Sequence, residues 1–422
     1  MIRLSIRLFN VNVIIGKMSQ TVENLDYGNG INPTNDILSD NSELVEKFEH
    51  MGLKKTILRG IFSYGYEDPS PIQKRAIPIF LKGTDIIAQA QSGTGKTATF
   101  SISILQSIDE DIKSVQSIII SPTRELSEQI YTVIRALASY TKIRFSLLLG
   151  GLSRSDQINS LREGAQCVIC TPGRFNDFLH NGCIDISNVK HLVLDEADEL
   201  LTPAFINQIR NVVEILPNKT QICLFSATLP PYCHETAERF LVDPEKITVR
   251  KEQLTLDGIT QYYIATENDK CKYDAITDLY SSMIINQLII YCNTKQRVIY
   301  LAENLVADGH TCTCIHSDLT TNERMNIMYQ FRKGDSRVLI STDLLSRGID
   351  VQQVSLVINY DIPRNIESYI HRIGRSGRFG RKGIALNFIS ANDRETMRRI
   401  EQFYCTEINE LPSNVDNLFN QK

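Results

Sequence analysis

The sequence lacks long hydrophobic runs, tryptophan and an excess of one charge sign. No stretch of about 18 consecutive apolar residues occurs, so no transmembrane helix is predicted. The chain has 45 Lys and Arg against 49 Asp and Glu, a net charge of −4, and neither half is basic. Any contact with a nucleic acid must therefore be local. A hydrophobic content of 42% in 422 residues predicts two or three folded domains.

The ten cysteines also lack a zinc-finger arrangement. The two close pairs, Cys167 with Cys170 and Cys312 with Cys314, lie in apolar runs typical of buried strands. Neither a second pair nor a histidine follows at metal-ligand spacing. We therefore predict reduced cysteines that pack as small hydrophobic side chains, as in a cytoplasmic protein.

One segment has a local excess of positive charge. Residues 364–399 contain nine Arg or Lys against three acids. A solvated helix face would account for such a run. However, Arg372, Arg375, Arg378 and Arg381 are crowded around glycines, which favours contact with phosphate or another polyanion.

The segment 90–97, A-Q-S-G-T-G-K-T, has the pattern of a phosphate-binding loop. It follows an apolar run that predicts a strand and precedes residues that can open a helix. Glycines let backbone N–H groups approach phosphate oxygens, lysine neutralises the outer phosphates, and the threonine hydroxyl suits Mg²⁺. A glycine-rich turn without a ligand is the alternative, which the Gly-Lys-Thr ending disfavours. The sequence therefore predicts a nucleoside triphosphate site made of Ala90, Gln91, Ser92, Gly93, Thr94, Gly95, Lys96 and Thr97.

A run of carboxylates follows a later apolar stretch. The residues 192–194, Leu-Val-Leu, lead directly into Asp195, Glu196, Ala197 and Asp198. An acid at a strand end beside a phosphate loop is where nucleotide hydrolases hold Mg²⁺, and we predict Asp195 and Thr97 as its ligands. Glu196 can accept a proton from the attacking water. A solvated helix start is the alternative, against which the apolar strand argues.

Short apolar runs alternate with helical periods along most of the chain. Strands are predicted at 85–89, 117–121, 144–149, 166–170, 190–194 and 221–225, and again at 260–264, 287–291, 311–315, 336–340 and 354–358. This alternation predicts an α/β protein with two doubly wound parallel sheets. The predicted domains span 42–248 and 259–422, joined by a linker at 249–258.

The N-terminal residues 1–41 are predicted to form a disordered extension. Within them, Arg3, Arg7 and Lys17 occur without an acid before Glu23, as in a mitochondrial presequence. Met18 also resembles a natural start, so we favour the interpretation that residues 1–17 reflect a start codon assigned too far upstream.

Several short motifs in the first half resemble those of the DEAD-box RNA helicases. Asp195 to Asp198 is the name-giving signature of that family, whose phosphate loop also begins with alanine, as at Ala90. The segment 65–73 with Phe48 upstream resembles the family's adenine-reading Q motif. There the Gln73 amide can bond the adenine edge, while a ring such as Tyr66 or Phe48 can stack on the base.

The resemblance continues through the second half, in the family's order. The segments 341–350 and 369–378 resemble its motifs V and VI, and Arg375 and Arg378 fall on its arginine fingers. The resemblance implies two tandem RecA-like domains and ATP with Mg²⁺ as cofactors. It implies Glu196, Asp195, Lys96, Arg375 and Arg378 as catalytic, and Asp350 as a further nucleotide contact. It also implies that Ser226, Thr228, Asp198 and His371 couple ATP hydrolysis to strand separation.

The same resemblance implies an RNA-binding surface that contacts the backbone of the strand. Such contacts carry little sequence information, so binding should be independent of sequence. The implied residues are Pro122, Thr123, Arg124, Gly151, Thr171, Arg174, Asn293, Thr342, Asp343, Arg347 and Gly348.

Residues 342–361 are most similar to the branch of the family that acts in translation initiation. We therefore expect a monomeric, cytoplasmic RNA helicase that unwinds short duplexes, binds no membrane and meets an initiation-factor-4G-type scaffold. Two alternatives stay open: an ATP-locked RNA clamp that nucleates a ribonucleoprotein, and a helicase of rRNA processing. The absence of tryptophan and the residues Leu344-Leu345 speak against the exon-junction type of clamp.

Overall fold

The computed structural model describes residues 44–91, 93–247, 258–282, 287–346, 354–376 and 383–412. The predicted N-terminal extension and most of the predicted linker lie outside these ranges. Within them, no helix has the length and apolar character needed to cross a membrane.

The first sheet has seven strands in the order β3-β4-β2-β5-β6-β1-β7, and each pairing is parallel. Because neighbouring strands in space are distant in sequence, each connection must cross the sheet, usually through a helix. The strands are β1 (Ile86–Gln89), β2 (Ser117–Ile120), β3 (Phe145–Leu148), β4 (Cys167–Cys170), β5 (His191–Asp195), β6 (Gln221–Ser226) and β7 (Glu245–Ile247).

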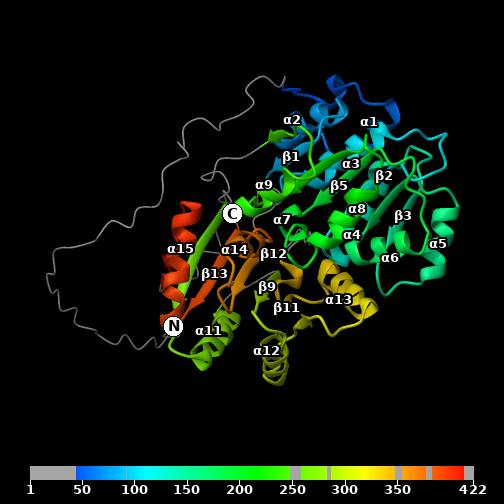
Figure 1. The fold of residues 1–422 in the computed structure, drawn as a ribbon. Helices are drawn as coiled ribbons and strands as arrows, with labels where there is room; N and C mark the ends of the chain where they lie inside the picture. Colours follow the sequence, from blue (N-terminus) through cyan, green and yellow to red (C-terminus); the bar gives the residue numbers. More distant parts are fainter. Residues whose placement is uncertain are drawn as a thin grey trace. The chain divides into compact units, whose positions relative to one another are not determined.

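Helices cover both faces of this sheet (Figure 1). They are α1 (Lys55–Tyr64), α2 (Pro71–Leu81), α3 (Lys96–Ser107), α4 (Arg124–Leu137), α5 (Arg154–Arg162), α6 (Pro172–His180), α7 (Ala197–Leu200), α8 (Ile206–Ile215) and α9 (Pro231–Ala237), after a 3₁₀ turn η1 (Phe48–Met51). Alternate residues of β1 serve the two faces: Ile86 and Ala88 join the core under α1 to α4, whereas Ile87 joins the core under α6 and α8.

The second sheet repeats the first in topology. Its order is β10-β11-β9-β12-β13-β8-β14, again with every pairing parallel. The strands are β8 (Ile259–Ala265), β9 (Gln287–Tyr291), β10 (Thr313–Ile315), β11 (Val338–Ser341), β12 (Val354–Asn359), β13 (Gly383–Ile389) and β14 (Asn409–Glu410). Position by position, β8 therefore corresponds to β1, and β12 corresponds to β5.

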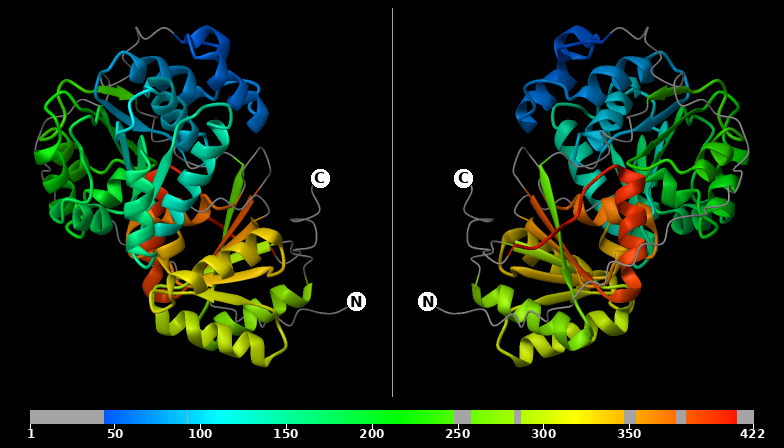
Figure 2. Two further views of the ribbon diagram at one scale, coloured as in Figure 1. Left: turned by 90° about the vertical axis from the view of Figure 1, so that its right-hand side faces the viewer. Right: turned by 90° about the vertical axis from the view of Figure 1, so that its left-hand side faces the viewer.

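Helices also cover both faces of the second sheet, as the two views of Figure 2 show. They are α11 (Asp269–Ser282), α12 (Lys295–Ala307), α13 (Thr321–Lys333), α14 (Ile366–Ile373) and α15 (Arg394–Tyr404), with 3₁₀ turns η2 (Asp343–Leu345) and η3 (Ala391–Asp393). The core on one face takes side chains from α11 and α12, and two cores on the other take them from α13 and from α14 with α15.

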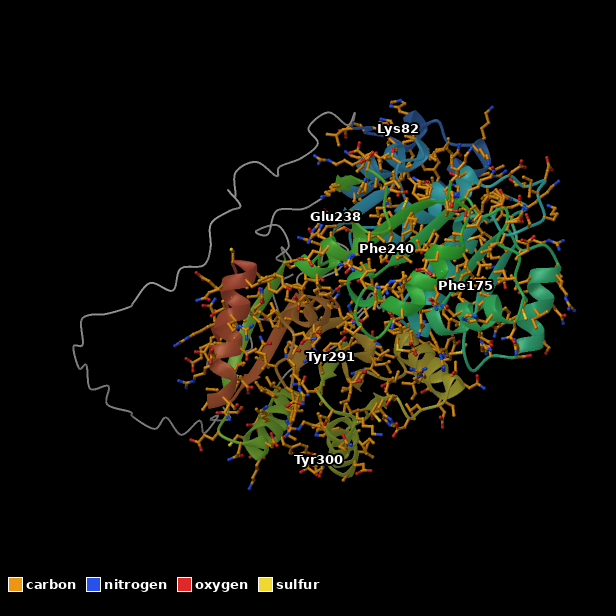
Figure 3. All side chains as sticks on the ribbon, in the orientation of Figure 1. Lys82, Phe175, Glu238, Phe240, Tyr291 and Tyr300 are labelled. Carbon is orange, nitrogen blue, oxygen red and sulfur yellow. The ribbon has the colours of Figure 1, made fainter. Side chains whose placement is uncertain are left out.

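Large aromatic side chains occupy both the core and the surface, and Figure 3 labels Phe175, Tyr291 and Tyr300 among them. Phe175 on α6 and Tyr291 at the end of β9 have no exposed surface, whereas Tyr300 on α12 is 59% exposed. The Tyr291 hydroxyl, although buried, donates to the carbonyl of Leu345 at 3.1 Å, which avoids the cost of an unpaired polar group.

The structure confirms the predicted fold class of two doubly wound parallel sheets. Predicted strands coincide with observed ones to within a few residues; for example, 221–225 corresponds to β6 and 287–291 to β9. Cys167, Cys170 and Cys223 are buried in strands as free thiols, as predicted, and burial raises the pKa of each. The domain boundaries stay predictions.

Candidate active site and RNA interface

The phosphate loop lies between β1 and α3, at the carboxyl edge of the first sheet. Gly95 has φ of 100°, in the left-handed region that favours glycine, and forms the N-cap of α3. The side chain of Lys96 is buried, and its Nζ donates to the carbonyls of Ala90 at 2.6 Å and Gln91 at 3.2 Å. The lysine thus holds the loop that surrounds it.

Lys96, Asp195 and Glu196 lie at this edge of the sheet and interact electrostatically. Burial lowers the pKa of Lys96, while the nearby carboxylates of Glu196 and Asp195 act in the opposite direction. Burial, and then the charge of Glu196, raise the pKa of Asp195. A divalent cation bound at this position would lower the pKa of Asp195, because a positive charge favours the ionised carboxylate.

The Asp195 carboxylate has the properties expected of a ligand for Mg²⁺. It is 3% exposed at the end of β5, and among the described residues no Lys, Arg or His forms an ion pair with it. Its Oδ1 accepts only the N–H of Glu196, at 3.0 Å. A buried carboxylate that has a lysine nearby but no direct ion pair keeps its oxygens available for a hard metal ion. The half-buried Thr97 on the first turn of α3 offers a hydroxyl as the second ligand.

Gln73 of the Q motif lies directly against the phosphate loop. Its Oε1 accepts the N–H of Ser70 at 2.8 Å, and its Nε2 lies 3.5 Å from the carbonyl of Gly95. A side chain at Gly95 would bring its Cβ to 2.7 Å from that Nε2. A side chain at this position would therefore displace the end of Gln73, and the contact connects the predicted base-reading residue to the loop.

The two aromatic residues proposed to stack on the base differ in exposure. Phe48 has no exposed surface and belongs to the core under α1 to α4. Tyr66 is half-buried, packs against the edge of that core and has its ring centroid 5.0 Å from that of Tyr64. In this structure Tyr66 is thus the accessible ring, whereas Phe48 supports the fold.

Glu196 has a strained backbone. Its φ of 52° lies in the left-handed region, which is unfavourable for a residue with a Cβ and occurs preferentially at functional sites. The side chain is 5% exposed, and its Oε2 has no hydrogen-bond partner. The conformation therefore presents a buried, unsatisfied carboxylate oxygen at the end of β5, where a general base is expected.

Asp198 connects three segments of the chain. Its carboxylate accepts the hydroxyls of Ser226 at 2.7 Å and Thr228 at 2.6 Å. It also lies 3.2 Å from Nε2 of His371 on α14, while Nδ1 of the same ring lies 3.9 Å from Glu196. All four predicted coupling residues thus meet in one buried cluster. Three of them belong to the first domain, and His371 belongs to the second.

Arg375 lies beyond the end of α14, in the turn that follows this cluster. It is 3% exposed, and its Nε donates to the carbonyl of His371 at 3.0 Å. The positive charge of Arg375 also lowers the pKa of Lys96, a smaller effect than that of burial or of the Glu196 and Asp195 carboxylates. The predicted arginine finger therefore lies on the nucleotide side of the second domain.

The RNA-binding loops predicted in the first domain also lie together. Thr123 forms the N-cap of α4, and Thr171 that of α6. Arg174 donates from Nε to the carbonyl of Leu149 at 3.0 Å and from Nη2 to that of Leu152 at 3.3 Å, which shapes the glycine-containing turn between them. The Arg124 guanidinium approaches the same turn: a Cβ at Gly151 would lie 3.3 Å from its Nη1. Pro122 is buried beneath these residues.

The sequence matches two family models that agree with these features. The model for the DEAD/DEAH box helicases matches residues 70–236, and the model for the helicase conserved C-terminal domain matches residues 271–380. The ATP-dependent RNA helicases eIF4A of Emericella nidulans and Pyricularia oryzae are each 50% identical to it over 386 residues. The alignments cover 92% of this chain and 97% and 98% of those relatives. The chain belongs to the DEAD-box family of ATP-dependent RNA helicases.

Solved structures of DEAD-box proteins share its fold. Dbp5 of S. cerevisiae, bound to RNA and ADP BeF3, is 35% identical with a TM-score of 0.84, over 89% of this chain and 97% of that one. Mss116p bound to ssRNA and AMP-PNP is 26% identical with a TM-score of 0.80, over 89% of this chain and 82% of that one. This agrees with the tandem RecA-like fold that the resemblance implied.

The RNA-binding residues predicted in the second domain of this DEAD-box protein form an internal network. Asp343 accepts two bonds from Arg372, at 2.5 and 2.9 Å, and Thr342 forms the N-cap of η2. The half-buried Asn293 amide makes two bonds within the chain: Nδ2 donates to the carbonyl of Ile362, and Oδ1 accepts from Arg372. Asn293 therefore helps to hold its neighbours in place, and its contact with RNA stays a prediction.

Arg372 was missed as a site residue by the sequence reasoning. It is the largest side chain with no exposed surface, and its guanidinium also donates to the carbonyl of Asp361 at 2.7 Å. The available signal was its place in motif VI, where three arginines recur at intervals of three residues, but nothing in that pattern indicates which of them points inward.

An ion pair between α4 and α13 was also missed. The Arg324 guanidinium lies 3.3 Å from the Glu125 carboxylate, and both side chains are at least nine-tenths buried. Beside it, Arg124, the residue before Glu125, donates to the hydroxyl of Thr321, one turn before Arg324. The sequence offered no indication of this contact, because its members are nearly 200 positions apart.

Five of the predicted site residues lie outside the described part of the chain. They are Ser92, Arg347, Gly348, Asp350 and Arg378.

Proposed function

We propose that this ATP-dependent RNA helicase hydrolyses ATP at an active site divided between its two domains, and that RNA favours the arrangement that completes this site. The cluster of Asp198, Ser226, Thr228 and His371 is the observation that carries the proposal. It supplies a direct contact between the DEAD motif and motif VI. Hydrolysis can therefore respond to the position of the second domain.

The first domain is proposed to bind the nucleotide. The phosphate loop surrounds the phosphates, Lys96 neutralises them, and Gln73 with Tyr66 recognises the base. Mg²⁺ would be held by Asp195 and Thr97, and it would supply positive charge to the phosphate oxygens.

Glu196 is proposed as the general base. Its Oε2 is buried without a partner and can accept a proton from the attacking water. The backbone strain at this residue holds the oxygen in place, so that no reorganisation is required when the proton moves. Arg375 stabilises the charge on the transferred phosphoryl group, a contribution of about 10³–10⁵ in rate for an arginine finger.

RNA is proposed to bind across the loops of both domains. Thr123, Arg124 and Thr171 contribute from the first domain, and Thr342 and Asp343 from the second. A strand that contacts both domains favours the arrangement in which they meet, in proportion to its differential affinity for that state. If this bends the strand, a short duplex loses its pairing locally.

We place this activity in translation initiation, in the cytoplasm, as a monomer that joins an initiation-factor-4G-type scaffold. The similarity to the two eIF4A helicases over nearly their whole length supports this assignment. Steady-state ATP hydrolysis with and without RNA tests the enzyme, and co-precipitation with a 4G-type scaffold tests the pathway. RNA-independent hydrolysis would contradict the divided site. Failure to bind the scaffold, with RNA-stimulated hydrolysis intact, would favour the rRNA-processing alternative or the RNA clamp.

A further inference from the structure

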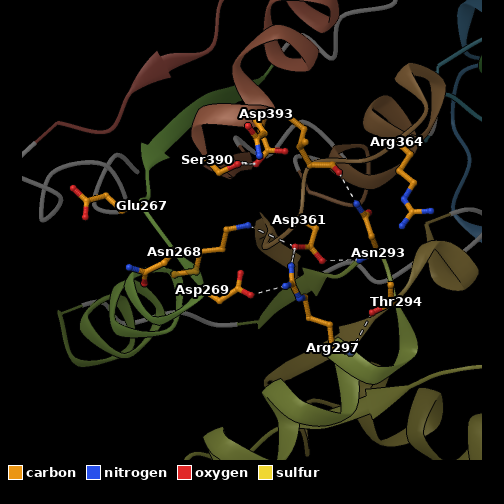
Figure 4. A pocket seen from close by; sticks show the side chains of 13 residues that line it. Glu267, Asn268, Asp269, Asn293, Thr294, Arg297, Asp361, Arg364, Ser390 and Asp393 are labelled. Carbon is orange, nitrogen blue, oxygen red and sulfur yellow. Dashed lines mark hydrogen bonds and ion pairs between the residues drawn. The ribbon is translucent and has the colours of Figure 1, made fainter.

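A polar pocket lies in the second domain, separate from the nucleotide and coupling residues described above. It has a volume of about 640 Å³ and is built from the segments that follow β8, β9, β12 and β13 (Figure 4). Parallel α/β sheets bind ligands outside the carboxyl ends of their strands, where neighbouring connections run in opposite directions. The volume is within the usual range for a small-molecule site.

The topology makes this pocket the counterpart of the phosphate-loop site in the first domain. β8 has the position of β1, so the loop 266–268 before α11 corresponds to the phosphate loop before α3. Asp361 follows β12 as Asp195 ends β5, and Lys272 on the first turn of α11 is buried as Lys96 is. Lys272 Nζ donates to the carbonyl of Tyr360, a backbone contact like that of Lys96 with Ala90.

The pocket is not built for a triphosphate. The loop 266–268 contains no glycine, and Glu267 and Asp269 place negative charge at the start of α11, where a phosphate chain would otherwise be favoured. Two of the three cations are already neutralised: Lys272 lies 3.6 Å from Asp361, and Arg297 pairs with Asp269 at 2.6 Å and also with Asp361.

One cation stays available for a ligand. Arg364 is exposed at the pocket and takes part in no hydrogen bond or ion pair with another described residue. In Figure 4 it lies on the opposite side of the view from Glu267, and no interaction reaches either side chain. The lining also includes the amides of Asn268 and Asn392 and the carboxylate of Asp393. Asn268 Oδ1 accepts the N–H of Cys271, and Asp393 Oδ2 accepts the N–H and hydroxyl of Ser390, so the Asn268 NH₂ group, the Asn392 amide and Asp393 Oδ1 are the groups offered to a ligand.

We propose that this pocket binds one nucleotide unit with a single phosphate, supplied either by the RNA strand or as a free 5′-mononucleotide. Arg364 binds the phosphate, because a guanidinium matches two phosphate oxygens. The amides and carboxylates bond the edge of the base, as asparagine does with adenine and acids do with cytosine amino groups. A lining with three cations and four acids tolerates one phosphate better than three.

The pocket is connected to the RNA-binding and ATPase motifs. Asp361 Oδ2 accepts the N–H of Asn293 at 2.9 Å, and the amide of Asn293 accepts Arg372 at 2.8 Å. Arg372 in turn binds Asp343 and lies one residue after His371. A nucleotide in the pocket therefore contacts residues whose partners hold motifs V and VI in place.

Binding can be measured on the full chain by saturation-transfer NMR with 5′-AMP, 5′-CMP, 5′-GMP and 5′-UMP. Excess ADP and Mg²⁺ occupy the phosphate-loop site, so that a signal reports the second domain. We expect at least one mononucleotide to bind. Arg364→Gln should weaken its affinity about tenfold, the effect of one charge-assisted hydrogen bond. Both this residue and the control, Arg398→Gln on α15, are exposed, so neither change should affect folding.

The two sources of the nucleotide are distinguished with a 4-thiouridine-containing RNA decamer. Displacement of the mononucleotide by the decamer, with crosslinks to residues 267–297 or 361–393, identifies the RNA strand as the ligand. Mononucleotide binding that the decamer leaves unchanged identifies the free nucleotide. The proposal is overturned if no mononucleotide binds and no crosslink falls in these segments, or if Arg364→Gln and Arg398→Gln bind equally.

Discussion

The carboxylate of Asp198 in the DEAD motif lies 3.2 Å from Nε2 of His371 in motif VI, and both side chains are almost completely buried. The same carboxylate holds Ser226 and Thr228, so one acid joins the strand end after β6 to a helix of the other domain. Because a hydrogen bond between buried groups weakens steeply as they separate, the contact depends strongly on the distance between the two domains.

The first prediction concerns this contact. His371→Ala should lower RNA-stimulated ATP hydrolysis by about 10- to 100-fold, the cost of losing a hydrogen bond to a buried charged group. Nucleotide affinity of the first domain should change little, because no residue of the phosphate loop is altered. Steady-state kinetics and equilibrium binding of a fluorescent ADP measure the two effects. An equal loss of ADP affinity would show that His371 supports the nucleotide site itself.

A second prediction separates chemistry from domain contact. Glu196→Gln removes the proton acceptor but keeps the shape, so hydrolysis should fall at least 100-fold while ATP still supports RNA binding. Arg375→Ala should also abolish hydrolysis, but it removes the group that we propose contacts the γ-phosphate from the second domain. In an RNA dissociation assay with ATP, Glu196→Gln should release RNA slowly and Arg375→Ala rapidly. Equal release rates would limit Arg375 to the chemical step.

The third prediction concerns the nucleotide. Lys96→Ala should reduce ATP hydrolysis at least about 100-fold, because the phosphates lose a buried positive charge. Gln73→Ala should weaken ATP and ADP but leave the weak binding of GTP unchanged, since only adenine would use the amide. Calorimetric titration of both nucleotides measures the difference. The contact of Gln73 with the Gly95 loop makes another result possible: an equal loss for ATP and GTP would mean that Gln73 shapes the loop.

The fourth prediction concerns the nucleic acid. Affinity for RNA should fall steeply with salt and vary little with sequence, because the predicted contacts reach the backbone. DNA of the same sequence should stimulate hydrolysis at least several-fold less, since it lacks 2′-hydroxyl groups. Hydrolysis rates at matched concentrations of the two polymers test this claim, and equal stimulation would exclude recognition of the 2′-hydroxyl.

A fifth prediction concerns pH and the contact between α4 and α13. Burial, and then the charge of Glu125, raise the pKa of Glu128 from 4.5 to about 7, against the charges of Arg332, Arg324 and Arg124. Between pH 4.5 and 7 the folded protein therefore binds a proton that the unfolded chain does not. The free energy of unfolding should decrease as pH rises through this range. Glu128→Gln should remove that part of the dependence.

Urea denaturation at pH 5.5 and pH 8 measures this effect. The wild type should lose more stability between the two values than Glu128→Gln does, whereas the exposed Glu214→Gln on α8 should behave as the wild type. The same pH dependence in all three proteins would show that Glu128 is normally ionised in the folded state.

The sequence alone was sufficient for the elements that are local. Apolar runs of four to six residues identified strands such as β1 and β6, because a buried parallel strand needs hydrophobic side chains on both faces. The phosphate loop was likewise predictable, since its glycines, lysine and threonine act within eight consecutive residues. Short motifs in a known order supplied the remaining site residues through resemblance.

The tertiary structure decided which of these side chains meet and which are used internally. Phe48 is a core residue, although it resembles a base-stacking ring in sequence, and the Asn293 amide bonds to Ile362 and Arg372, which the sequence did not indicate. The inward orientation of Arg372, the ion pair of Arg324 with Glu125 and the pocket beside Arg364 all depend on how separate segments pack. A strand or a loop is encoded by residues that are neighbours along the chain. These contacts instead join residues up to about 200 positions apart, and the distance between such residues is set only when the sheets and helices pack together.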